Sequence, residues 1–208
     1  MYLDFFHLRE YPFSITPDPK FLYFAASHRA AFDHLRYGIL QRKGFIELTG
    51  EVGCGKSTLC RAVLETLGDS TRSALILNPC LNGAQLLRAI LADFGLEAPR
   101  QDRFTQIQTL NRFLLQQAAE GINVALILDE AQDLPNRTIE EVRLLSNLET
   151  ASRKLIQIVL AGQPELKQRL ESPGLRQLRQ RITVRCHVPP LAGDEVAAYI
   201  ERRLRCAG

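Results

Sequence analysis

The sequence predicts an α/β fold in which a five-stranded parallel sheet lies between layers of helices. Short apolar segments alternate with longer segments of helical periodicity between residues 45 and 188, as in chains that form parallel sheets. Residues 124–128 are apolar throughout, which is typical of a strand buried on both faces. A glycine-rich segment ending in Gly55-Lys56-Ser57 joins an expected strand to an expected helix, an arrangement typical of a phosphate-binding loop.

The amino-terminal segment is expected to be an extended arm. Three prolines lie among residues 12–19, and proline excludes helix at such density. Ser27 is expected to cap the first helix, over residues 28–42.

The rest of the chain divides into alternating elements. The expected strands cover residues 45–49, 74–77, 124–128, 155–160 and 182–188. The expected helices cover residues 56–67, 84–94, 104–119, 139–148, 164–170, 175–180 and 194–205. Pro189-Pro190 marks a change from sheet to helix and predicts a domain boundary near residue 190. We therefore expect an arm over residues 1–25, a nucleotide-binding domain over 26–190, and the start of a helical lid over 191–208.

Composition excludes several classes of protein. The chain has 208 residues, 46% of them hydrophobic, which suits one full core. No apolar run approaches the roughly 20 residues of a membrane-spanning helix, and the first residues do not resemble a signal peptide. The cysteines are odd in number and form no Cys-x-x-Cys pair, so we expect reduced thiols and a cytoplasmic location. They are Cys54, Cys60, Cys80, Cys186 and Cys206.

Charge is unevenly distributed along the chain. Residues 44–166 carry 11 basic and 15 acidic side chains, whereas residues 167–208 carry 9 basic and 4 acidic ones. The basic segment is compatible with contacts to nucleic acid, acidic lipid or the nucleotide of a neighbouring subunit. An ordinary solvated helix face explains it equally well.

Residues 50–58 match the pattern G-x-x-x-x-G-K-[ST]. Glycines let the backbone curl and turn its N–H groups toward phosphates, and the following helix directs its positive end at the same anion. We expect Lys56 to bind the β- and γ-phosphates of ATP and the Ser57 hydroxyl to bind Mg²⁺. The predicted nucleotide-binding residues of this loop are Gly50, Glu51, Val52, Gly53, Cys54, Gly55, Lys56, Ser57 and Thr58. Cys54 is either a redox-sensitive thiol or a filler residue.

Two acids follow the buried strand over residues 124–128. The carboxyl ends of parallel strands face the ligand, so Asp129 is expected beside the metal and Glu130 is expected to act as general base toward water. The alternative is that the pair caps the next helix, although Asp133, close before Pro135, suits that role better.

A glutamine and several arginines extend the candidate site. Gln163 follows the fourth strand and is expected either to bond the γ-phosphate or water, or to be a polar helix start. Arg181, and after it Arg179, are candidates for an arginine supplied to a neighbouring subunit's nucleotide. Plain surface arginines are the alternative.

Four segments resemble the ExeA/GspA-type AAA+ ATPases of bacterial general (type II) secretion and their pilus and exopolysaccharide relatives. They are residues 11–23, the phosphate loop with Leu59-Cys60-Arg61, residues 128–132 with 143–150, and residues 160–166. The arm and the Gly-Gln-Pro-Glu-Leu segment are the most specific of these. The similarity runs from residue 2 to about residue 206.

The resemblance implies an AAA+ core with strand order 5-1-4-3-2. It places the nucleotide base against the arm and first helix, around Ile15, Pro17 and His28, although His28 is equally well explained as a packing residue. It also implies that Gln163 lies in the sensor segment. Self-association into a ring or other oligomer is expected, with arginine from one subunit at the next subunit's site.

The resemblance further implies ATP hydrolysis that drives assembly of an envelope secretion or pilus apparatus. In full-length relatives the lid continues and is followed by a membrane helix, so we expect the lid to be truncated here. One alternative is a DNA-linked ATPase of the transposition or initiator type, but the sequence contains no aromatic-basic stacking pattern or recognition helix. Another is a nucleotide-sensing scaffold with little turnover.

Overall fold

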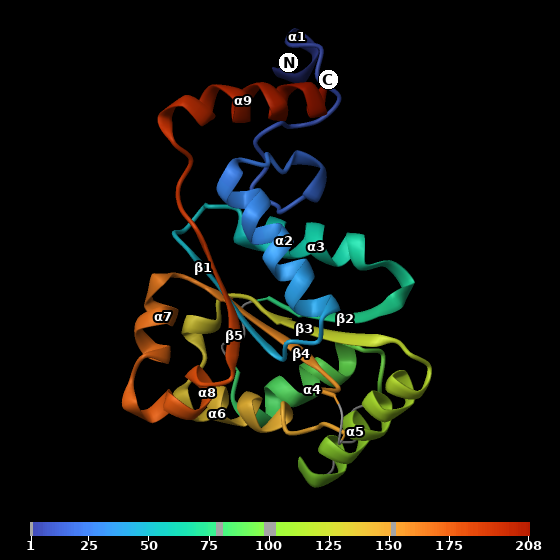
Figure 1. Cartoon of the computed structure of the whole chain (residues 1–208). Helices are drawn as coiled ribbons and strands as arrows, with labels where there is room; N and C mark the ends of the chain where they lie inside the picture. Colours follow the sequence, from blue (N-terminus) through green and yellow to red (C-terminus); the bar gives the residue numbers. More distant parts are fainter. Residues whose placement is uncertain (1, 78–80, 98–102, 151–152) are drawn as a thin grey trace.

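The protein is built on one parallel sheet of five strands, shown in Figure 1. The computed structural model describes residues 2–77, 81–97, 103–150 and 153–208. The strands are β1 (Phe45–Gly50), β2 (Thr71–Ile76), β3 (Asn123–Leu128), β4 (Gln157–Gly162) and β5 (Ile182–Val188). Their spatial order is β2-β3-β4-β1-β5, and every neighbouring pair is parallel. This confirms the predicted α/β fold and strand order.

Helices cover both faces of the sheet (Figure 1). On one face lie α2 (Ala26–Leu40) and α3 (Lys56–Leu67); on the other lie α4 (Gly83–Asp93), α5 (Arg103–Ala119), α6 (Asn136–Leu145), α7 (Pro164–Leu170) and α8 (Arg176–Arg179). Along β3, alternate residues enter different cores: Leu126 packs with the layer of α4 and α5, and Ile127 with α2 and α3. This double burial explains why the strand is apolar throughout.

Several expected boundaries were shifted. The predicted strand over residues 74–77 begins earlier, because Arg72 and Ser73 belong to an edge strand that exposes polar side chains and still pairs with β3. The predicted strand over 155–160 is observed as β4, which starts and ends two residues later. Helix α6 lies three residues before its predicted position and ends where the Ser146 hydroxyl donates to the carbonyl of Arg143 (2.7 Å).

Two capping predictions were wrong. Helix α2 begins at Ala26 with Ala25 as its N-cap, so Ser27 lies inside the first turn. The carbonyl of Ala25 already accepts the first helical hydrogen bond, from the Arg29 N–H (2.9 Å). Asp133 does not cap α6 either, because it lies in the short 3-10 turn η3 (Ala131–Asp133), and α6 starts only after Pro135.

Three further 3-10 turns lie in the described part of the chain. They are η1 (Pro19–Phe21), η2 (Gly68–Ser70) and η4 (Pro173–Leu175). The helix expected over residues 175–180 is divided between η4 and α8. The sequence did not predict the four-residue helix α1 (Tyr2–Phe5).

The last helix, α9 (Gly193–Ala207), packs on the arm, at the end of the molecule where both termini lie (Figure 1). The Arg9 N–H donates to the carbonyl of Ala207 (2.7 Å), and the Arg203 guanidinium donates to the carbonyl of Pro12. The same guanidinium lies 4.9 Å from the ring centre of Phe21. The two ends of the sequence therefore form one layer above α2 and α3. None of the described helices is long and apolar enough to cross a membrane.

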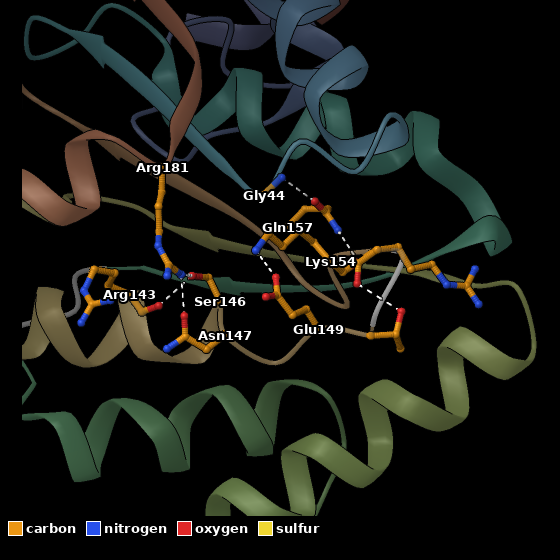
Figure 2. A network of polar contacts seen from close by, with 10 residues as sticks. Gly44, Arg143, Ser146, Asn147, Glu149, Lys154, Gln157 and Arg181 are labelled. Atoms are coloured by element: carbon orange, nitrogen blue, oxygen red, sulfur yellow. Dashed lines mark hydrogen bonds and ion pairs between the residues drawn. The ribbon is translucent and has the colours of Figure 1, made fainter.

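A buried glutamine fixes the start of β1, the strand that leads into the phosphate loop. Gln157 is fully buried, and its Oε1 accepts a hydrogen bond from the Gly44 N–H (2.8 Å), as Figure 2 shows. Gly44 has a positive φ of 82°, which favours glycine. The Gln157 side chain on β4 therefore determines where the neighbouring strand β1 begins.

Replacing Gln157 with leucine is expected to lower the free energy of unfolding by about 1 to 3 kcal/mol, because the Gly44 N–H is left without a partner. Urea unfolding measures the change, with Gln177→Leu on the exposed side of α8 as the matched control. A loss no larger than in the control would contradict this role for Gln157.

Candidate nucleotide-binding site

The phosphate loop connects β1 to α3, as the sequence predicted. Gly53 and Gly55 both have φ of 78°, and Gly55 is the N-cap of α3. Gly50 meets the edge strand closely: a Cβ there would lie 2.5 Å from the carbonyl oxygen of Val188. The glycines thus allow the curled backbone and the close approach of β5.

The Lys56 ammonium lies inside this loop. Lys56 is buried, and its Nζ donates to the carbonyl oxygens of Gly50 (2.8 Å) and Glu51 (2.9 Å). The Lys56 ammonium therefore lies beside the positive end of α3. Both positive groups favour a bound anion at this place.

The buried carboxylate of Asp129 contacts the start of the same helix. It follows β3 directly, is 2% exposed, and accepts a hydrogen bond from the Glu130 N–H (3.0 Å), and the Ser57 side chain lies close enough to lower its pKa. Burial raises the pKa of Asp129, and the Ser57 side chain and the Glu130 N–H oppose that rise. The structure thus brings together the two predicted metal ligands, which are 72 residues apart in the sequence.

Glu130 adopts a backbone conformation that is unusual for its residue type. Its φ is 52° and ψ is 39°, in the left-handed region. Such strain is found where the surroundings fix a residue, often at functional sites. Its Oε2 accepts hydrogen bonds from the side-chain amides of Gln132 (2.7 Å) and Gln163 (3.3 Å). Gln163 therefore lies beside Glu130, although β4 and β3 are separate in the sequence.

A cavity of about 540 Å³ opens between the arm, the loop and α9. Ile15 and His28 line it, whereas Pro17 does not. The His28 ring bonds the Cys54 carbonyl through Nε2 (3.0 Å), so this histidine also supports the loop. The residues that complete the lining are Phe13, Ser14, Phe21, Leu22, Tyr23, Val52, Gly53, Cys54, Gly55, Thr58, Pro190, Leu191, Tyr199 and Arg203.

The candidate arginines lie away from this cavity and differ in their partners. Arg181 donates to the Ser146 hydroxyl (2.8 Å) and to the Asn147 side-chain oxygen (2.6 Å), and so ties the start of β5 to the end of α6 (Figure 2). The Arg179 side chain is exposed and makes no hydrogen bond or ion pair within the described part of the chain.

Sequence reasoning missed several residues at the site. Gln132 was noticed only as part of a family-like segment, because nothing in a lone glutamine indicates what it contacts. Arg169 on α7 donates to the carbonyls of Gln132 and Leu134, a contact that depends on tertiary structure. Tyr199 and Arg203 are more than 140 residues from the phosphate loop, so spacing gave no signal for them.

The cysteines in the described residues, Cys54, Cys60, Cys186 and Cys206, are free, and Cys80 lies outside those residues. Burial raises the pKa of the Cys186 thiol to about 12, so this thiol stays protonated at neutral pH.

Glu47 is a buried charge on β1, close to the phosphate loop. It is 4% exposed and pairs with Arg185 (Oε2 to Nε, 3.3 Å). The pair borders a cavity of about 340 Å³ that Lys167, Glu171 and Arg179 also line. Burial raises the pKa of Glu47, and the Arg185 guanidinium opposes that rise.

Comparison with known proteins agrees with this geometry. The AAA domain family matches residues 39–170. Over its full length, the chain is 47% identical to General secretion pathway protein A of Aeromonas hydrophila, and it spans 38% of that protein's length. This confirms the resemblance seen in the sequence.

Solved structures show the same fold at low sequence identity. The ORC2 protein of Aeropyrum pernix, in ADPNP–ADP complexes, superposes with a TM-score of 0.65 at 19% identity, covering 87% of this chain and 51% of that chain. Cdc6p of Pyrobaculum aerophilum gives a TM-score of 0.66 at 18% identity, covering 91% and 54%.

The raised pKa of Glu47 predicts how stability changes with pH. The folded chain holds this proton more tightly than the unfolded chain, whose pKa lies near 4.5, so stability falls as the pH rises from that value through the folded pKa. Glu47→Gln removes the titration, and its stability relative to the parent chain is expected to grow between pH 4 and pH 7. Urea unfolding across this range, with Glu65→Gln on the exposed side of α3 as control, measures the difference, and a gap that does not widen would contradict it.

Proposed function

The chain belongs to the AAA domain family, and we propose that it binds Mg-ATP at residues 50–58 and hydrolyses it with Glu130 as general base. The observation that carries this proposal is the contact between Ser57, at the start of α3, and the buried Asp129, at the end of β3. It joins a phosphate loop to a pair of acids at the carboxyl edge of one parallel sheet, where ligands bind in such folds.

The loop is built to hold a polyphosphate. Gly53 and Gly55 have the positive φ that turns backbone N–H groups toward an anion. Lys56 already lies within the loop on backbone carbonyls, which ATP phosphates would replace as acceptors. In the ORC2 structure named above, the fold holds ADPNP and ADP.

Ser57 and Asp129 suit Mg²⁺. Both offer oxygen, the ligand that Mg²⁺ prefers, and an oxygen pair completed by phosphates and water is its usual setting. No group of three or more His, Cys, Asp or Glu suited to a metal occurs among the described residues, so the nucleotide would complete the coordination. When bound, the ion would neutralise charge on the phosphates.

Glu130 and Gln163 are placed to act on water beside the terminal phosphate. Glu130 is half-buried, directly after Asp129, and its carboxylate accepts a hydrogen bond from the Gln163 side chain (3.3 Å). A carboxylate here takes the proton from water, and Gln163 orients either the water or the γ-phosphate.

The cavity beneath the arm is the proposed site of the adenine ring. Ile15 and His28 contribute to it, and Tyr199 on α9 adds an aromatic face from the far end of the chain. Pro17, which was also expected there, does not line this cavity.

We further propose Arg179, ahead of Arg181, as the arginine presented to a neighbouring subunit. The structure favours this order because Arg181 is engaged by Ser146 and Asn147, whereas Arg179 is exposed. This assignment requires self-association into a ring or other oligomer, which we propose together with it.

The biological role is proposed from the relative. General secretion pathway protein A is 47% identical over this chain, and this supports cytoplasmic ATP hydrolysis that drives assembly of an envelope secretion or pilus apparatus. A DNA-linked role has less support, because part of the basic carboxyl-terminal segment is used in internal contacts. Arg169, Arg181, Arg185, Arg203 and Arg205 all bond groups of the same chain.

Glu130→Gln is expected to bind ATP as the parent chain does but to hydrolyse it at least about 100-fold more slowly, because the proton acceptor is lost. Lys56→Ala is expected to lose binding itself, and Glu65→Gln on the exposed side of α3 serves as control. Nucleotide titration and phosphate release measure both steps. Normal turnover by Glu130→Gln would remove Glu130 as the base, and tight ATP binding by Lys56→Ala would overturn the loop assignment.

Arg179→Ala is expected to slow hydrolysis by about a thousandfold at protein concentrations that favour the oligomer, and to have no effect at high dilution. Arg181→Ala is instead expected to lower the free energy of unfolding by about 1 to 3 kcal/mol, since buried Ser146 loses a partner. Steady-state rates across a concentration series together with urea unfolding, with Arg176→Ala as control, separate the two. A loss of activity in Arg179→Ala that is equal at every concentration would argue against a trans role.

A further inference from the structure

Gln132 links the carboxylate of Glu130 to the end of β4. Its Nε2 donates to Glu130 Oε2 (2.7 Å), and its Oε1 accepts from the Gln163 N–H (3.0 Å). We propose that Gln132 is a positioning residue that couples Glu130 to Gln163, so that a movement of Gln163 changes the placement of the carboxylate. This inference rests on the proposed function, in which Glu130 is the base.

The amide side chain makes both of these contacts at once. It donates through nitrogen and accepts through oxygen, whereas an ionised carboxylate only accepts and a thioether makes neither bond well. The bond to Glu130 is also charge-assisted, and such bonds are stronger than those between neutral groups. The chemistry at position 132 is therefore tightly constrained.

The neighbouring backbone leaves room for this amide. Gly162, the last residue of β4, has no Cβ, and a Cβ there would lie 2.5 Å from Gln132 Oε1. Any other residue at this position would displace the amide or the turn that carries it. The close approach of Gln132 to β4 thus depends on a glycine immediately before Gln163.

Helix α7 holds the turn that carries Gln132. The Arg169 guanidinium donates to the Gln132 carbonyl, to the Leu134 carbonyl (2.5 Å) and to Asn136 Oδ1 (2.6 Å). Because α7 begins directly after Gln163, one short helix holds both the turn that carries Gln132 and the end of β4. Helix α7 therefore holds both Gln132 and Gln163 in place.

The contacts also determine which oxygen of Glu130 remains available. Gln132 and Gln163 both donate to Oε2, and no donor among the described residues contacts Oε1. Gln163 donates two hydrogen bonds here: its N–H to Gln132 Oε1, and its side-chain amide to Glu130 Oε2. A shift of Gln163 toward a phosphate would thus alter both bonds to Oε2 and turn the carboxylate.

Gln132→Met keeps the length and volume of the side chain and removes both bonds. It is expected to lower kcat for ATP about tenfold, as loss of a charge-assisted bond at a reacting group does, while KM and the Kd for ATP stay within about twofold. Gln168→Met, on the exposed side of α7, is the matched control. A merely structural defect would change KM and thermal stability together with kcat.

A double-mutant cycle with Gln163→Met tests the coupling itself. If the two glutamines act as one unit, the double variant loses little more activity than the more affected single variant, whereas losses that multiply would overturn the coupling. Should Gln132→Met not fold, Gln132→Leu also removes both bonds without adding a charge beside Glu130, and the same loss of kcat is expected.

Glu130→Gln, measured alongside, separates this inference from the function on which it rests. Normal turnover by Glu130→Gln means that the proposed base is wrong. If Glu130→Gln is inactive while a folded Gln132 variant turns over at the parent rate, only the role of Gln132 is overturned.

Discussion

The approach of Ser57 to the buried carboxylate of Asp129 is the contact on which the rest of the site depends. This contact brings the start of α3 to the end of β3 across a parallel sheet. Burial raises the pKa of Asp129. A carboxylate buried this deeply is costly unless donors or a cation compensate it. The position is therefore poorly explained by packing alone, and it supports the proposal that a divalent cation is held there with a nucleotide.

Around this contact, the fold fixes each group by a neighbour from another element. Gln157 sets the start of β1, and the close approach of β5 at Gly50 shapes the loop that follows. The arm and α9, from opposite ends of the chain, close the cavity beside the loop, with Arg203 bonded to the Pro12 carbonyl. The cavity proposed to hold the nucleotide thus depends on the docking of α9 as much as on the sheet.

The sequence was sufficient where function depends on local chemistry. The glycine-rich loop between β1 and α3, the acid pair after an apolar strand and the parallel sheet were predicted from the residues, because glycine spacing and continuous burial leave direct marks in a sequence. The strand order was implied by the resemblance to the family. Contacts between distant elements leave no such mark in the sequence. Gln132 and Arg169 carry no motif of their own, and the internal partners of Arg181 follow from how α6 and β5 pack. Ser27 failed as a cap because Ala25 and Ala26 extend the helix by a few residues, a choice that propensity alone does not resolve.

The specific rate of ATP hydrolysis, measured against protein concentration with Mg²⁺ and with and without duplex DNA, tests the central claim most directly. A magnesium-dependent rate per subunit that rises with concentration and is indifferent to DNA is the result that this account predicts. The absence of hydrolysis at every concentration, with or without Mg²⁺, would contradict it, and a rate that requires DNA would contradict the proposed role in envelope assembly.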